Sequence, residues 1–188
     1  MTWGVCPFAT FYGDSDGCYG AVCENEPVLF VDHTMVGWKR TLDGPWRREN
    51  RVIVHFGIGR DGSVSQYRSI FSSHYGNGVH NPQYLQTDNP YLRELVAGRF
   101  PHHASNGWFY RGPDGANLLN THTISFEHED GGDPSQPWTE EMLAATIAVK
   151  RWCLGEMRAV GGGFSEFDPY RLVGHYEIDR VNKARCPG

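Results

Sequence analysis

The chain has 188 residues, of which 39% are hydrophobic and 21% are charged, a balance that predicts one globular domain with its own core. Its net charge is −5 with acidic and basic residues interspersed, so the sequence lacks the basic patch typical of nucleic-acid-binding proteins. We therefore expect that the protein does not bind nucleic acid. No apolar run approaches the length needed to cross a bilayer, so we also expect no insertion into a membrane.

Residues 1–27 are rich in Gly, Cys and Asp and follow no clear hydrophobic period, which predicts an irregular arm ahead of a compact domain over 28–188. The first Lys or Arg is Lys39, and the N-terminal segment "MTWGVCPFATFYGDSD" has no apolar region, so we expect no signal peptide. The cysteines are odd in number, so disulfides alone would leave one thiol free. They are Cys6, Cys18, Cys23, Cys153 and Cys186.

The next segments predict strands and a hairpin. "VLFVDHT" (28–34) is a near-continuous apolar run, which is typical of a strand covered on both faces. "RVIVHFGIG" and "SVSQYRS" flank Arg60-Asp61-Gly62, and Asp-Gly between two such runs predicts a hairpin turn. A short helix is expected after Pro90, followed by a long loop over residues 98–120.

The second half predicts a strand, the main helix and a last short strand. "THTISFEHE" (121–129) alternates, with Ile124, Phe126 and His128 on one face and Ser125 and Glu127 on the other. Thr139 is the expected N-cap of a helix that glycines end at 161–163. Its apolar stripe is expected to comprise Met142, Val149, Cys153, Met157 and Val160. With "RLVGH" (171–175) as a strand, the pattern predicts a single α/β domain with a mixed central sheet flanked by helices.

Three polar residues lie at the C-terminal ends of predicted strands, where ligands and chemistry collect in open α/β sheets: His33, Glu127 and His175. Two histidines and the thiolate of Cys186 match a catalytic zinc site, which uses three protein ligands and keeps one position open. A carboxylate such as Glu127 beside that position is suited to act as general base. Lys183 is suited to hold negative charge that develops on an oxygen.

These segments together resemble the type-2 N-acetylmuramoyl-L-alanine amidase family, which includes phage lysozyme-type amidases and peptidoglycan recognition proteins. The resemblance covers residues from about 28 to the end. It rests on "VLFVDHT", "VIVHFGIGRDGSVSQYRS", "SSHYGNG", "NTHTISFEHEDGG" and "GHYEIDRVNKARCPG" in that order. It implies Zn²⁺ on His33, His175 and Cys186, catalysis by Glu127 and Lys183, and cleavage of bacterial peptidoglycan between N-acetylmuramic acid and L-alanine.

Further contacts with the substrate are expected from His74, Asn120 and Trp108. The chain departs from the family pattern at two places. Some relatives carry a catalytic tyrosine where this chain has Val54, which leaves the proton transfer to Glu127. Many members have one residue between the lysine and the cysteine of the closing loop, where this chain has Ala184 and Arg185.

Several alternatives stay open at the level of sequence. With no signal peptide we expect a monomeric phage endolysin that is made in the host cytoplasm and then reaches the cell wall. A cytoplasmic wall-recycling amidase, a trimmed secreted autolysin and a non-catalytic peptidoglycan-binding module on the same fold are the competing interpretations. A small disulfide-stapled secreted protein would instead use Cys186 in a bridge.

Overall fold

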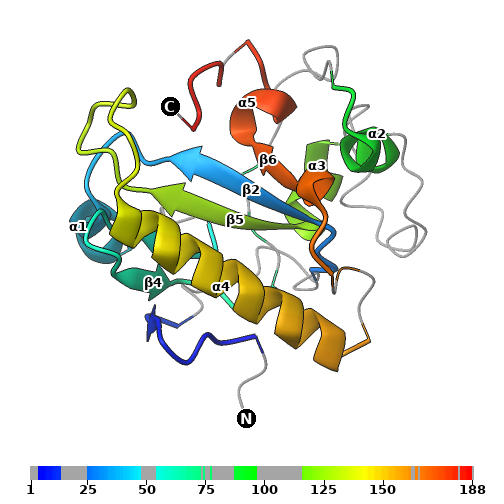
Figure 1. The fold of residues 1–188 in the computed structure, drawn as a ribbon, viewed down its shortest axis with the longest axis horizontal. Coiled ribbons are helices and arrows are strands. Elements are labelled where there is room, and N and C mark those ends of the chain that lie inside the picture. Colours follow the sequence, from blue (N-terminus) through cyan, green and yellow to red (C-terminus); the bar gives the residue numbers. More distant parts are fainter. Residues whose placement is uncertain are drawn as a thin grey trace.

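The computed structural model describes residues 4–13, 25–47, 54–72, 74, 77, 87–96, 116–161, 164, 166–181 and 183–187. These residues form a six-stranded mixed sheet in the order β1-β4-β3-β5-β2-β6, with helices on both faces (Figure 1). The strands are β1 (Thr10–Phe11), β2 (Leu29–Thr34), β3 (Phe56–Ile58), β4 (Val64–Gln66), β5 (Thr123–His128) and β6 (Leu172–Gly174). The helices are α1 (Lys39–Thr41), η1 (Leu42–Trp46), α2 (Pro90–Val96), α3 (Ala116–Thr121), α4 (Glu140–Ala159), η4 (Pro169–Arg171) and α5 (His175–Ile178). The α/β prediction is confirmed.

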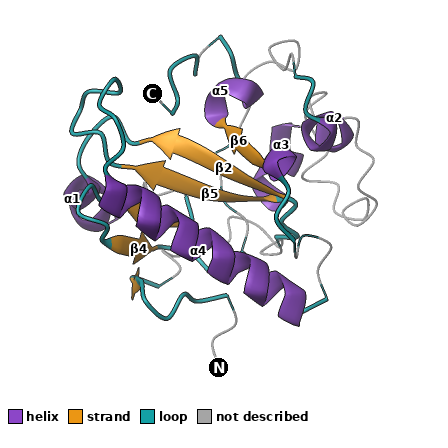
Figure 2. Cartoon of the chain, viewed as in Figure 1, coloured by secondary structure: helices purple, strands orange, loops and turns teal. Residues whose placement is uncertain are grey.

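Strand β2 is covered on both faces, as its apolar run predicts. Phe30 points toward α4 and packs with Phe126 and Phe164 in the larger core cluster. Leu29 and Val31 point the other way, into a second cluster that also contains side chains from α2, α3 and α5. Figure 2 shows α4 crossing one side of the sheet while α2, α3 and α5 lie beyond β2.

The predicted hairpin is also confirmed. β3 and β4 pair antiparallel, with Phe56 opposite Gln66 and Ile58 opposite Val64. The turn closes through a bond of 2.8 Å from the Gly59 N–H to the Ser63 carbonyl. Gly62 in this turn has a φ of +78°, which a residue without a Cβ adopts at low cost.

Helix α4 begins where the sequence predicts, because the Thr139 side chain accepts a hydrogen bond of 3.1 Å from the Met142 N–H. The inward stripe differs from the prediction at one position. Thr146 is buried with the other predicted residues, whereas Val160 is 48% exposed. Val160 is the C-cap, with φ −96° and ψ 5°, so the helical period no longer sets its direction.

Two predicted irregular regions contain regular structure. Residues 10–11 of the N-terminal arm form β1, which pairs with β4, and Cys6 of the same arm is buried in the larger core cluster. The end of the predicted loop 98–120 is helix α3. Short elements of this kind have too few residues to show a period. Cys18, Cys23 and Trp108 lie outside the described residues, whereas Cys6, Cys153 and Cys186 have free thiols.

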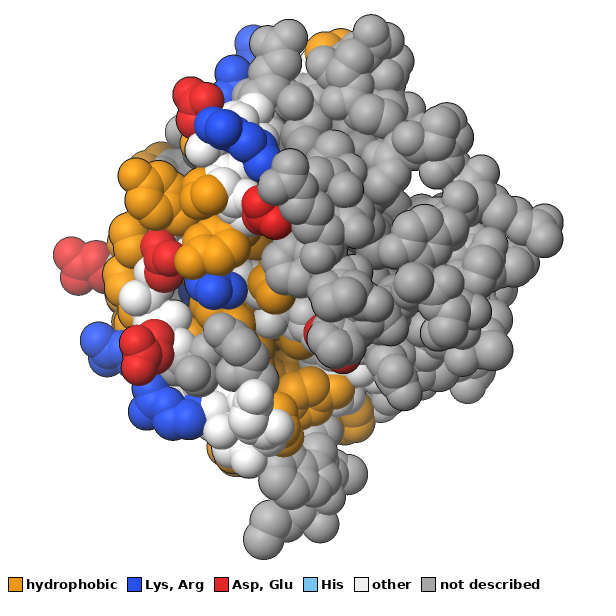
Figure 3. Space-filling view, turned by 90° about the vertical axis from the view of Figure 1, so that its right-hand side faces the viewer, with side chains coloured by type: hydrophobic (Ala, Val, Ile, Leu, Met, Phe, Trp, Pro, Cys, Tyr) orange, Lys and Arg blue, Asp and Glu red, His pale blue; other side chains and the backbone are white. Residues whose placement is uncertain are grey.

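The surface of the described residues mixes charge and apolar character. On the face shown in Figure 3, hydrophobic side chains alternate with acidic and basic ones. None of the helices in the described part of the chain is both long and apolar enough to cross a membrane.

Strand direction brings the predicted site residues to one edge. β5 and β6 both run parallel to β2, with Glu127 opposite His33 and Gly174 opposite Asp32. Their carboxyl ends therefore share one edge, and the C-terminal segment lies beside the end of β2 (Figure 1).

Candidate metal centre

The structure brings His33, His175 and Cys186 together. Each offers one ligand atom, and these three atoms lie within 4.8 Å of one another. The imidazole rings of His33 and His175 are 4.4 Å apart between centroids, and Nδ1 of His33 lies 3.9 Å from Sγ of Cys186. Strand β2 supplies the first histidine, the start of α5 supplies the second, and the closing loop supplies the cysteine. The sequence predicted this grouping although His33 lies more than a hundred positions before the other two residues.

The closing loop accommodates its extra residue in a tight turn. The Cys186 N–H donates to the Lys183 carbonyl at 2.9 Å, which places Ala184 and Arg185 at the middle of the turn. The Cys186 carbonyl then accepts a bond of 2.7 Å from the Tyr176 N–H, directly after His175. These two bonds hold the cysteine beside the second histidine.

The chemistry of these three side chains fits zinc. Burial, followed by the neighbouring His175, holds the pKa of His33 well below its ordinary value, so His33 is neutral and able to bind a metal. Burial raises the pKa of Cys186 to about 11, although its Sγ accepts a bond of 3.3 Å from the Thr34 N–H. A cation is the charge that would stabilise the thiolate here. Two imidazoles and one thiolate form a donor set typical of catalytic zinc sites.

Glu127 lies opposite His33 in the sheet and has one buried carboxyl oxygen with an unused hydrogen-bonding capacity among the described residues. Its Oε2 is buried and has no hydrogen-bond partner among the described residues. Burial raises the pKa of Glu127 to about 8, while the charge of Lys183 acts in the opposite direction. Lys183 also lowers the pKa of Cys186 and of His33, which places its charge near all three groups. A carboxyl group with an unused oxygen and a perturbed pKa is a candidate for proton transfer.

A layer of buried polar side chains, linked by hydrogen bonds, lies in the interior next to His33. His74 Nε2 lies 2.8 Å from Oγ1 of Thr123, and Asn120 Oδ1 accepts a bond of 3.1 Å from the Asn77 N–H. The sequence predicted substrate contacts for His74 and Asn120, and the structure places both side chains in this interior layer. Their role with substrate stays a prediction.

Asn77 is the polar residue that sequence reasoning missed. Its Oδ1 lies 2.5 Å from Nε2 of His33, on the opposite side of the ring from Cys186. The only signal was its position in "SSHYGNG", a segment with a family resemblance but no period.

Val54 and His55 are both buried in the protein interior. Val54, where some relatives carry tyrosine, is buried in an apolar cluster with Met35, Leu42 and Tyr67. His55 accepts a bond of 3.1 Å from the Ser125 N–H, and burial lowers its pKa to about 3. Val54 has no group that can transfer a proton, and the His55 ring is engaged with the backbone of Ser125.

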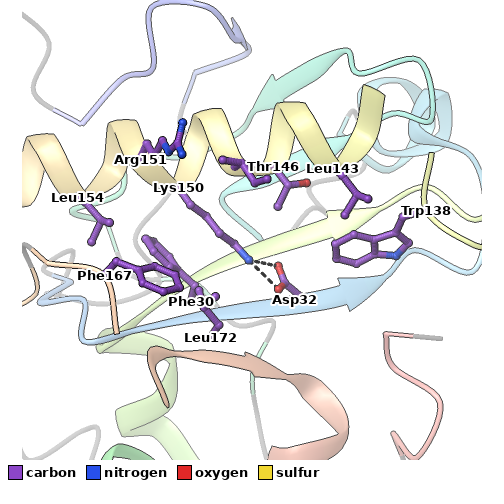
Figure 4. A pocket seen from close by; sticks show the side chains of 11 residues that line it. Phe30, Asp32, Trp138, Leu143, Thr146, Lys150, Arg151, Leu154, Phe167 and Leu172 are labelled. Carbon is purple, nitrogen blue, oxygen red and sulfur yellow. Dashed lines mark hydrogen bonds and ion pairs between the residues drawn. The ribbon is translucent and has the colours of Figure 1, made fainter. Parts of the chain in front are cut away.

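A separate pocket of about 590 Å³ lies on the other face of the sheet (Figure 4). Lys150 reaches from α4 to Asp32 of β2 and contacts its carboxylate oxygens at 2.7 and 2.8 Å. Because successive side chains of a strand point to opposite faces, Asp32 faces α4 whereas His33 faces the metal centre. The pocket is therefore not part of the candidate metal site.

The comparisons agree with this geometry. The profile of the N-acetylmuramoyl-L-alanine amidases of type 2 matches residues 25–188, and the chain belongs to this family. A search of curated proteins returned no significant match. The family places the chain in the class of N-acetylmuramoyl-L-alanine amidases, and the solved structures share its fold.

Three solved structures illustrate the shared fold. AmpD, as its selenomethionine derivative, is 18% identical with a TM-score of 0.57, covering 97% of this chain and 89% of that chain. The endolysin amidase LysCS of Clostridium intestinale URNW is 14% identical with a TM-score of 0.53, covering 98% and 90%. The Drosophila peptidoglycan recognition protein SD is 13% identical with a TM-score of 0.53, covering 96% and 89%.

Proposed function

We propose that the protein is a zinc-dependent amidase that hydrolyses the bond between the lactyl group of N-acetylmuramic acid and L-alanine in peptidoglycan. The observation that carries the proposal is the grouping of His33, His175 and Cys186 within 4.8 Å, beside a buried carboxyl oxygen of Glu127 that has no hydrogen-bond partner in the part of the chain that the structure describes. A binding module has no need for a group that accepts and returns protons.

The residues that would hold zinc are His33, His175 and Cys186. Bound there, the metal would supply Lewis-acid chemistry, polarising the scissile carbonyl and lowering the pKa of water. The Glu127 carboxylate takes a proton from the water that attacks the carbonyl carbon. Lys183 stabilises the negative charge that develops on the carbonyl oxygen. Glu127 then gives the proton to the leaving nitrogen, the C–N bond breaks, and a free L-alanine amine and a lactyl carboxylate result.

We further propose that the enzyme acts as a phage endolysin, made in the host cytoplasm and acting on the cell wall. Support comes from the fold that it shares with the LysCS endolysin amidase. A monomer is sufficient for this role, because one chain supplies all five residues of the proposed site.

The test is digestion of purified peptidoglycan, with separate measurement of new amino termini and new reducing sugar ends. We expect new alanine amines that disappear with a chelator and return with zinc. Reducing ends would contradict the proposal in favour of a glycosidase. Sedimentation with the wall but no new ends of either kind would instead establish a binding module.

A further inference from the structure

We propose that Asn77 is a positioning residue that fixes His33 in the tautomer whose Nδ1 lone pair faces the metal centre. The inference rests on the proposed zinc site. A neutral imidazole has one N–H and one lone pair, and the lone pair binds a metal. Asn77 is fully buried and contacts Nε2, whereas Nδ1 lies on the side of Cys186. The proton position on His33 therefore depends on which end of the Asn77 amide faces the ring.

A chain of hydrogen bonds determines that orientation. The Thr123 hydroxyl lies 2.5 Å from the Leu119 carbonyl oxygen, which only accepts, so the hydroxyl proton is donated there. Thr123 Oγ1 must then accept from its neighbour on Asn77, also at 2.5 Å, and only the amide NH₂ donates.

The opposite end of the amide is then Oδ1, which faces His33 and can only accept. The imidazole nitrogen beside it, Nε2, must therefore carry the proton. The Ser125 hydroxyl donates to the same Oδ1 at 3.2 Å, which agrees with this polarity. A backbone carbonyl thus determines, through two side chains, that the lone pair of His33 lies on Nδ1.

Asn120 holds Asn77 in place. Its carbonyl accepts a bond of 3.1 Å from the His74 N–H, and its side chain accepts one of 3.1 Å from the Asn77 N–H. Two bonds from one residue at the end of α3 thus hold the backbone of both His74 and Asn77. Asn120 therefore supports the metal centre through Asn77.

Groups that orient metal-bound histidines typically contribute about 10- to 100-fold in metal affinity. Three variants separate positioning from general packing. Asn77→Leu removes the acceptor at similar size, and Asn77→Asp keeps an acceptor. Asn89→Leu is the matched control. Asn89 is also buried and accepts from the Tyr91 and Leu92 N–H groups at the start of α2, without contact to the metal ligands.

The measurements are zinc affinity by competition with a chelator of known affinity, and the ¹⁵N shifts of the His33 ring by NMR without metal. We expect Asn77→Leu to weaken zinc binding about 10- to 100-fold and to lose the pure Nε2–H state, while Asn77→Asp stays within about threefold of the wild type. Asn89→Leu is expected to lower the melting temperature while leaving both readouts unchanged.

The proposal is wrong if Asn77→Leu keeps wild-type zinc affinity and the Nε2–H tautomer, or if Asn89→Leu weakens zinc binding equally. It is also wrong if the wild type binds no zinc. A wild type that binds zinc but releases no alanine amine contradicts only the amidase function, because neither readout depends on turnover.

Discussion

Replacement of Glu127 by Gln tests the proposed proton transfer most sharply. The amide keeps the size and hydrogen-bonding ability of the side chain but cannot take a proton from water. A positioned general base contributes about 10²- to 10⁴-fold to a rate. At about 1.4 kcal/mol for each factor of ten, the variant should lose roughly 3 to 5 kcal/mol of transition-state stabilisation.

The same substitution should not weaken folding. Burial raises the pKa of Glu127 from 4.5 to about 8, so below about pH 4.5 the carboxyl group is uncharged in the folded and the unfolded chain alike. Glutamine there replaces one neutral group by another, and we expect a change in unfolding free energy within about 0.5 kcal/mol. At neutral pH only the unfolded wild type ionises, so the metal-free variant should be at least as stable as the wild type. Loss of activity without loss of stability distinguishes a catalytic carboxylate from a structural one.

The assay is kcat/KM for release of alanine amines from peptidoglycan, with zinc content and melting temperature measured on the same preparations. Glu166→Gln is the matched control, because Glu166 is an exposed carboxylate. The control should keep wild-type activity. If zinc-loaded Glu127→Gln retains activity within about tenfold of the wild type, Glu127 is not the general base.

Three further predictions concern stability. Because the pKa of Glu127 is raised from 4.5 to about 8, the metal-free folded chain keeps a proton that the unfolded chain releases. The unfolding free energy of the wild type minus that of Glu127→Gln should therefore fall as pH rises from 4.5 to about 8, by at most about 1.4 kcal/mol per pH unit. A difference that does not change with pH would contradict this prediction. Lys150→Met leaves the carboxylate of Asp32, which is only 14% exposed, without its cation, and should cost about 3 kcal/mol in urea unfolding. Arg151 is the exposed neighbour of Lys150, and Arg151→Met should lower the unfolding free energy by about 0.5 kcal/mol. Equal losses in the two variants would refute the importance of the ion pair between Lys150 and Asp32. Thr139→Ala removes the N-cap of α4 and should cost about 1 to 2 kcal/mol by thermal unfolding, and an unchanged midpoint would exclude a stabilising cap.

Much of the fold was predictable because its signals are local. The apolar run of β2, the alternation of β5 and the Asp-Gly turn each depend on neighbouring residues. The N-cap at Thr139 is likewise a property of one helix start. The position of His33, Glu127 and His175 at the carboxyl ends of predicted strands, together with the family resemblance, predicted that they group. The parallel pairing of β2, β5 and β6 brings these strand ends to one edge.

The remaining features depend on tertiary contacts that no local pattern records. Asn77 lies in a stretch of sequence without a period, and its contact with His33 depends on Asn120, which binds the Asn77 N–H. Val160 leaves the apolar stripe because the helix ends there. Strand β1 has two residues, which is too short for alternation to appear. The lack of a hydrogen-bond partner for Glu127 Oε2 among the described residues can be recognised only when the positions of the surrounding groups are known.

The central claim is that one zinc ion binds at His33, His175 and Cys186. Its most direct test is zinc X-ray absorption spectroscopy on the purified protein, after measurement of metal stoichiometry. We expect one zinc per chain, with a single sulfur neighbour at about 2.3 Å and nitrogen neighbours at about 2.0 to 2.1 Å. The sulfur signal should be absent in Cys186→Ser. Zinc without a sulfur neighbour, or less than stoichiometric zinc after saturation and desalting, would contradict it.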